Sequence, residues 1–176
     1  MKRTSLHSRQ CPVARSLERV GDQWSILLLR DAFYGLTRFD EFLKSLDIAP
    51  NMLTRRLNQM VEDGLFERRQ YSDRPPRYDY LLTPRGWDFR PVMLTLMNWG
   101  NRHFAPEGTS VFLAEKTSGA AVQLQLIDAI SGQPISSQHA ITAGPAANPR
   151  MRQRLEAGRL RRAQNLHSLP AQDTQP

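Results

Sequence analysis

The polar face of one amphipathic segment, residues 50–63, carries side chains that can read DNA bases. Its apolar residues recur at helical spacing, so a helix would bury them and turn the polar set outward. Arginine and asparagine can each bond two atoms on the edge of a guanine or adenine in the major groove, and threonine can bond a phosphate. A solvated face of an ordinary helix is the alternative. The candidates are Asn51, Arg55 and Asn58 for base edges, with Thr54 and Arg56 for phosphates.

The β-prone runs 65–71 and 78–83 predict a hairpin around a polar, proline-containing loop. Arg74 and Arg77 bracket two prolines there, so a stiff tip would present two guanidinium groups. Such groups bind phosphates and enter the minor groove of DNA. Each arginine taken singly also fits a solvated loop, so the interpretation depends on helix and hairpin together. Arg38 is a further candidate for phosphate or minor-groove contact.

The charge of the chain agrees with an anionic partner. Its 176 residues have a formal net charge of +7 and a pI near 10.3. Residues 1–105 carry +5 of this charge and residues 106–176 carry +2. A basic balance of this size favours nucleic acid as the partner, with general solubility as the alternative.

Several classes of protein are disfavoured by what the sequence lacks. The single cysteine, Cys11, excludes a disulfide within the chain and a cysteine-clustered metal site. No apolar run approaches the ~18 residues of a membrane span, and the first residues lack the apolar stretch of a secretory signal. The four histidines are far apart, and no phosphate-binding glycine loop or hydrolase motif appears. We therefore expect a soluble, cytoplasmic protein that is not an enzyme and holds no cofactor or metal.

The elements that position the polar face are predicted from helix starts, helix stops and apolar spacing. Four helices should precede the hairpin and one should follow it. Pro12 opens the first helix and Gly21 ends it; Asp22 caps the second and Gly35 ends it; residues 39–46 and 50–63 form the third and fourth, with Gly64 just past the end. The expected fold is mainly α with a small β-hairpin wing: a winged helix-turn-helix.

The helix after the hairpin is expected to be long and partly covered by a second chain. Thr83 caps it, Pro84 takes its first position and Pro91 kinks it. It carries more apolar residues than one contact face requires, so a second copy of the chain should cover part of it.

Composition changes at Ala105–Pro106, where we place a domain boundary. Residues 1–105 form the expected DNA-binding and dimerisation domain, 106–147 a small β-rich extension, and 148–176 a basic helix and a disordered tail. Strands are predicted over 111–114 and 121–129, with a third over 139–142. The basic helix begins at Pro149 and holds six arginines and one glutamate between residues 150 and 162. It is either a solvated helix or a supplementary phosphate contact.

Ordered blocks over roughly residues 9–104 resemble the HxlR family of bacterial transcriptional regulators. The blocks are Cys11–Arg15 with Gly21 and Trp24, Leu29–Asp31, Arg38–Phe42, Pro50–Leu57, Glu62–Leu65 with Glu67 and Arg68, Arg74–Thr83, and then Gly86, Pro91, Trp99 and Gly100. The resemblance implies a winged-helix homodimer, joined through its first and last helices, that binds an operator and represses or activates a nearby operon. Ala49 departs from the pattern, since many relatives have Ser or Thr at this N-cap, and it predicts a weaker helix start.

Cys11 is a candidate redox sensor. It lies beside a helix N-terminus, whose dipole favours a thiolate, and Arg9 and Arg15 are close in sequence. Some relatives sense oxidants or electrophiles at this position; a small buried residue in the dimer interface is the alternative. Two further interpretations stay open: a winged-helix module that binds an unknown small-molecule effector, or one that binds protein partners, each with weak DNA binding.

Overall fold

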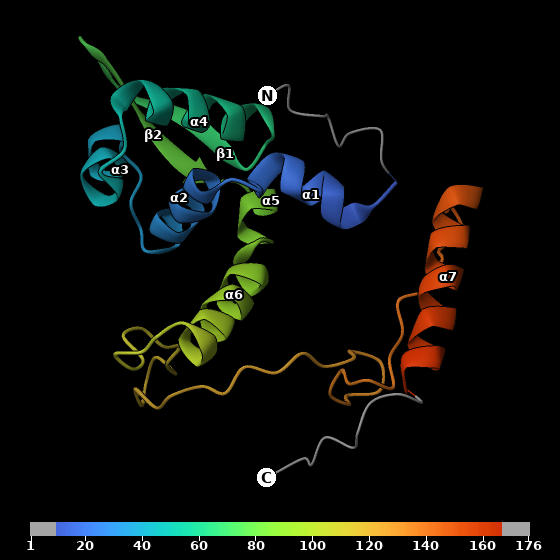
Figure 1. Ribbon diagram of the computed structural model, residues 1–176. Helices are drawn as coiled ribbons and strands as arrows, with labels where there is room; N and C mark the ends of the chain where they lie inside the picture. Colours follow the sequence, from blue (N-terminus) through green and yellow to red (C-terminus); the bar gives the residue numbers. More distant parts are fainter. Residues whose placement is uncertain (1–9, 167–176) are drawn as a thin grey trace. The chain divides into compact units, whose positions relative to one another are not determined.

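The computed structural model describes residues 10–166. The predicted disordered tail and Arg9 lie outside these residues. The elements are α1 (Pro12–Val20), α2 (Gln23–Phe33), α3 (Phe39–Leu46), α4 (Pro50–Glu62), β1 (Phe66–Asp73), β2 (Pro76–Leu82), α5 (Pro84–Trp87), α6 (Arg90–His103) and α7 (Pro149–Leu166) (Figure 1). The mainly helical fold with one two-stranded antiparallel hairpin is the predicted winged-helix arrangement.

The chain divides into two compact units. One unit spans Ser16–Gln125, and the other joins the start of α1 to the chain from Leu126 onward. The first unit includes residues 106–125, the beginning of the expected extension. The expected boundary after residue 105 stays a prediction. Among residues 10–166, none of the helices combines the length and the apolar character that a membrane span requires.

The core of the first unit lies between α2, α3, α4 and the hairpin, which pack on one another. Phe42 of α3 and Phe66 of β1 are fully buried, with ring centroids 6.3 Å apart. The other large, fully buried apolar residues come from α2 and α4: Leu28, Leu29, Leu53, Leu57 and Met60. Burial of so many apolar side chains, at about 1.5–3 kcal/mol each, fixes α4 against the rest of the unit.

The starts of α2 and α4 differ in the way predicted. Asp22 Oδ1 accepts the N–H groups of Trp24 and Ser25, each at 3.1 Å, and so satisfies two free donors of α2. Ala49 at the N-cap of α4 provides no side-chain acceptor. Gly64 ends α4 with φ of +69°, a conformation that glycine adopts without strain.

The hairpin is longer than its β-prone runs indicate. Ser72 pairs with Arg77 and Asp73 with Pro76, so only Arg74 and Pro75 form the turn. The expected loop of six residues is therefore wrong, because backbone hydrogen bonding continues through polar residues that carry no apolar alternation. A bulge at Tyr71 interrupts the register.

The single kinked helix expected after Thr83 is two helices. Thr83 Oγ accepts the N–H of Gly86 at 3.1 Å and caps α5, which ends at Trp87. After a break, α6 begins at Arg90 with Pro91 in its first turn, where the missing N–H of proline has no helical partner to lose. No residue of α6 is fully buried.

The predicted strands of the extension do not form. In the part of the chain that the structure describes after residue 105, isolated bridges join Ala114 to Ala121 and Ile127 to Pro134. The carboxylate of Glu115 instead accepts the N–H groups of Thr117 and Ser118, and these bonds lower its pKa to about 2. Local turns of this kind compete with strand pairing. The basic helix, α7, begins at Pro149 as predicted.

Candidate nucleic-acid interface

The outer face of α4 is polar and exposed, as the helical spacing predicts. The exposed side chains include those of Asn51, Thr54, Arg55 and Asn58. The opposite face of the helix is buried in the core. The buried core packing on the inner face leaves α4 without freedom to roll. A rigid helix that presents amide and guanidinium groups on one side is the geometry of major-groove readout.

Two of these side chains have unused hydrogen-bonding groups. Within residues 10–166, the side chains of Arg55 and Asn58 make no hydrogen bond or ion pair. By contrast, Asn51 Oδ1 accepts the N–H of Met52 at 2.7 Å, and the Thr54 hydroxyl donates to the carbonyl of Pro50 at 2.9 Å. Arg55 and Asn58 are therefore the members of the set most available to a ligand.

Arg56 lies apart from the exposed face. Its NH1 atom is 3.0 Å from Oδ2 of Asp22, and its side chain is 17% exposed. The Nε–H of Arg56 is buried without a hydrogen-bond partner among the described residues. Since the same Asp22 carboxylate caps α2, this ion pair joins α4 to the start of α2. The phosphate contact through Arg56 stays a prediction, with NH1 already engaged by Asp22.

A second ion pair holds the other end of α4. Asp63, its C-cap residue, accepts from Arg19 of α1 at 3.0 Å between Oδ1 and Nε. The carbonyl oxygen of Asp63 also accepts from Arg85 NH1 at 2.8 Å. Sequence reasoning missed both partners of α4. Asp22 was interpreted only as an N-cap and Asp63 only as the end of its helix, so neither was recognised as the partner of an arginine.

The candidate arginines of the hairpin lie in different environments. Arg74 is exposed in the turn, whereas Arg77 lies on β2 rather than in a loop. Arg38, next to α3, is held by Asp79 of β2 at 3.6 Å and stacks over the ring of Tyr71, 4.6 Å from its centroid. The side chain of Arg38 is half-exposed, so part of its guanidinium group still faces solvent.

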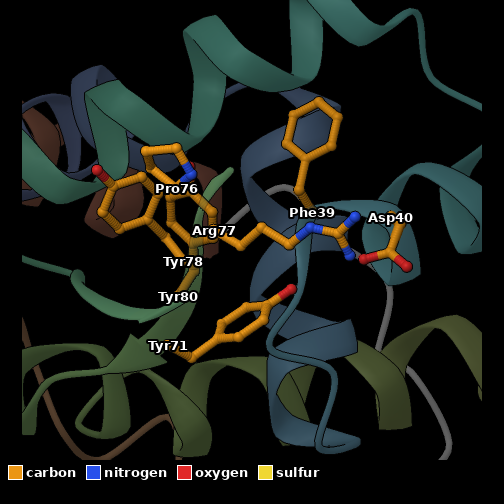
Figure 2. A pocket seen from close by; sticks show the side chains of 7 residues that line it. All are labelled: Phe39, Asp40, Tyr71, Pro76, Arg77, Tyr78 and Tyr80. Carbon is orange, nitrogen blue, oxygen red and sulfur yellow. The ribbon is translucent and has the colours of Figure 1, made fainter. Parts of the chain in front are cut away.

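Arg77 lines an aromatic cleft between α3 and the hairpin. The cleft has a volume of about 520 Å³ and is walled by Phe39, Tyr71 and Tyr78 among others. Figure 2 shows the Arg77 side chain extending across the cleft in the direction of Asp40. The guanidinium group is thus carried by a strand and flanked by rings, which limits its conformations more than a solvated loop would.

Comparison with known proteins identifies the family. The HxlR-like helix-turn-helix family model matches residues 19–108, which include α2 to α6. The chain belongs to this family. An uncharacterized helix-turn-helix transcriptional regulator of Mycobacterium tuberculosis (strain H37Rv) is 38% identical over 128 residues, 72% of this chain and 81% of the relative. The family is one of transcriptional regulators, not of enzymes.

Solved structures agree with the assignment of this HxlR-like regulator. PA1374, described as a transcription factor of Pseudomonas aeruginosa, is 58% identical with a TM-score of 0.60 and covers 82% of this chain and all of its own. The redox regulator HypR, in its reduced form, is 32% identical with a TM-score of 0.51, over 55% of this chain and 99% of its own. The protein is therefore a transcriptional regulator with a helix-turn-helix domain.

Cys11 of this HxlR-like regulator belongs to the second unit. Its free thiol is half-buried and lines a cavity of about 600 Å³ formed by residues 10–15 and 141–155. The side chain of Gln10 accepts the N–H of Asn148 at 2.7 Å, which ties the start of α1 to the segment before α7. The thiol thus lies beside a space large enough for a small thiol or oxidant.

The arginines of α7 differ in how far they are already engaged. Arg159 forms two hydrogen bonds with the carboxylate of Glu156, at 2.7 and 3.0 Å. Arg152 donates to the carbonyl oxygens of Ala147 and Pro145. In the described part of α7, Arg150 and Arg161 make no ion pair with the chain. The helix keeps both of its interpretations, as a solvated helix or a phosphate contact.

Proposed function

We propose that this regulator binds a specific operator in duplex DNA as a homodimer, with α4 in the major groove and the hairpin on the flanking minor groove or backbone. One observation carries the proposal: Arg55 and Asn58 project from a rigid helix of a helix-turn-helix domain and have no partner within residues 10–166. The side chains of arginine and asparagine can each form two hydrogen bonds with the edge of one base in the major groove.

The proposed contacts divide into two classes. Arg55, Asn58 and Asn51 contact base edges, because their side chains can bond two atoms of one base. The phosphates and the minor groove are contacted by Thr54, Arg38, Arg74 and Arg77. Arg56 supports the interface from behind through Asp22. Phosphate contacts contribute affinity to every sequence, whereas base contacts create the preference for one.

The proposed homodimer joins the first and last helices of the domain. Val92, Leu96 and Trp99 on α6 are exposed, and so are Val13 and Leu17 on α1. Exposed apolar side chains on two helices favour coverage by a second copy. A two-fold dimer would place its two α4 helices about 34 Å apart, one turn of the duplex. Since the DNA of a bacterium lies in the cytoplasm, we place the regulator there.

The test is to select bound fragments of genomic DNA with the purified full-length protein, and then to footprint the enriched site. The proposal predicts one enriched motif with two half-sites about 10 base pairs apart, and a dimer by light scattering. Binding should also weaken steeply as the salt concentration rises. A pool of fragments without a common motif, or binding that is insensitive to salt, would contradict it and favour a module that binds protein or effector with little DNA affinity.

A second candidate function is thiol-based redox sensing through Cys11. It is favoured by the half-buried free thiol and by similarity to HypR, which is named a redox regulator. With one cysteine in the chain, a switch requires a bridge between subunits or an adduct with a small thiol. The measurement is DNA binding of wild type and Cys11→Ser before and after treatment with diamide. Equal responses of the two proteins would end this candidate.

A further inference from the structure

A three-walled apolar cavity lies beside the helix to which α4 is attached. Its volume is about 390 Å³, within the range of small-molecule sites. Leu27 and Phe33 of α2 form one wall, Met93 and Met97 of α6 form the second, and Phe112 belongs to the third. The walls come from separate parts of one compact unit, Ser16–Gln125.

The third wall lies outside the segment that the family model matches. Phe112 and its two neighbours follow the family-matched segment, which ends at residue 108. The Asn101 side chain donates to the carbonyl of Val111 at 2.8 Å and ties this wall to α6. Because residues 111–113 of the same chain cover one side of the cavity, it suits a small molecule better than another helix.

The charge at the cavity is positive. Arg30 and Arg90 line it, and no lining residue among residues 10–166 is acidic. Arg30 donates through Nε and NH2 to Oδ1 of Asp31, each at 2.8 Å, so its charge is largely balanced. Arg90, at the start of α6, is exposed and makes no ion pair within residues 10–166. One unbalanced cation at the edge of an apolar cavity complements one anionic group on an apolar body.

We propose that this cavity binds an amphipathic organic monoanion, with its apolar body between α2 and α6 and its carboxylate on Arg90. The proposal does not rest on DNA binding. An occupant would contact α2, and α2 holds α4 through the pair between Asp22 and Arg56. A small acid bound in the cavity would therefore act on the DNA-binding helix α4 indirectly, through α2.

The probes are decanoate and 1-decanol, which share a chain and differ in charge, titrated calorimetrically into the full-length protein without DNA. Decanoate should bind saturably, and at least about tenfold more tightly than decanol, since a charge-assisted hydrogen bond to Arg90 distinguishes them. Arg90→Gln should remove this preference. Phe112→Ala should weaken both probes, because it opens the third wall.

The controls are Arg102→Gln, which removes an exposed charge from α6 outside the cavity, and Ile130→Ala, which removes an exposed apolar side chain elsewhere. Both should bind decanoate as wild type does. Equal binding of the two probes, no saturable binding, or equal decanoate binding by Arg90→Gln and wild type would overturn the proposal. So would decanoate binding that appears only when light scattering shows the dimer dissociating, because the cavity would then be a subunit surface.

Discussion

The guanidinium NH1 of Arg56 lies 3.0 Å from Oδ2 of Asp22, the residue that caps α2. Arg55, its neighbour in sequence, is exposed and unpaired within residues 10–166. The two adjacent arginines of α4 therefore differ in their environments. Arg56 fixes the helix within the fold, and Arg55 has a guanidinium group available to a ligand.

Arg56→Met should destabilise the protein and weaken DNA binding equally for all sequences. The pair is mostly buried, so losing it leaves Asp22 without a charged partner and should cost about 1–3 kcal/mol of unfolding free energy. Urea unfolding measures the loss. Asp22→Asn provides the matched variant, since asparagine still caps a helix but removes the charge. If the two substitutions combined additively in a double-mutant cycle, the contact would have no energetic role.

Ala49→Ser should stabilise the domain. Serine at an N-cap accepts an N–H of the first turn that Ala49 leaves without a side-chain partner, a gain of about 0.5–2 kcal/mol. Chemical denaturation of the two proteins gives the difference directly. Ala49→Val adds side-chain atoms without an acceptor and should show no gain; a similar rise for valine would mean that capping is not the cause.

Stability should fall at alkaline pH through Tyr80. Burial raises the pKa of this phenol, against the lowering effect of the Arg68 charge. Below the unfolded-state pKa near 10.0 the phenol is protonated in both states. As pH rises further, the unfolded state loses its proton first, so unfolding becomes easier until the folded pKa is passed. Urea unfolding at pH 8 and pH 11 should show a smaller alkaline loss for Tyr80→Phe than for wild type. The exposed Tyr34, changed to Phe, should keep the full loss.

The sequence was sufficient to predict the parts of the site that depend on local periodicity. Leu53, Leu57 and Met60 are buried, and Asn51 and Asn58 are exposed. A helix repeats every 3.6 residues, and the apolar residues of this segment recur at that spacing. The capping of α2 by Asp22 and the end of α4 at Gly64 were predicted for the same reason: each depends on neighbouring residues.

Features that depend on distant partners were not predictable. The role of Arg56 is decided by Asp22, which is far away in sequence, and nothing in the helix containing Arg56 identifies that partner. The division between α5 and α6 and the failure of strands in the extension follow from local turns that compete with longer elements. Hairpin length was underestimated because ladder bonds are made by the backbone, whatever the side chains.

Arg77→Ala should weaken binding to operator and random duplex by the same factor. A phosphate contact carries no sequence information, and its loss should lower the slope of log affinity against log salt by about 1. Fluorescence anisotropy across a salt series measures both quantities. Arg102→Ala, which removes one charge from the end of α6, should leave the slope unchanged. A loss confined to the operator would instead assign Arg77 to a base.

If the exposed face of α4 reads bases, Arg55→Ala should reduce the preference of the protein for its operator. The measurement is the ratio of affinities for the selected operator and for a scrambled duplex of equal length, for wild type and variant at one salt concentration. The variant should lose about 1–3 kcal/mol on the operator and little on the scrambled duplex, with unchanged stability. Equal losses on the two duplexes would contradict the claim, because Arg55 would then contact only the backbone.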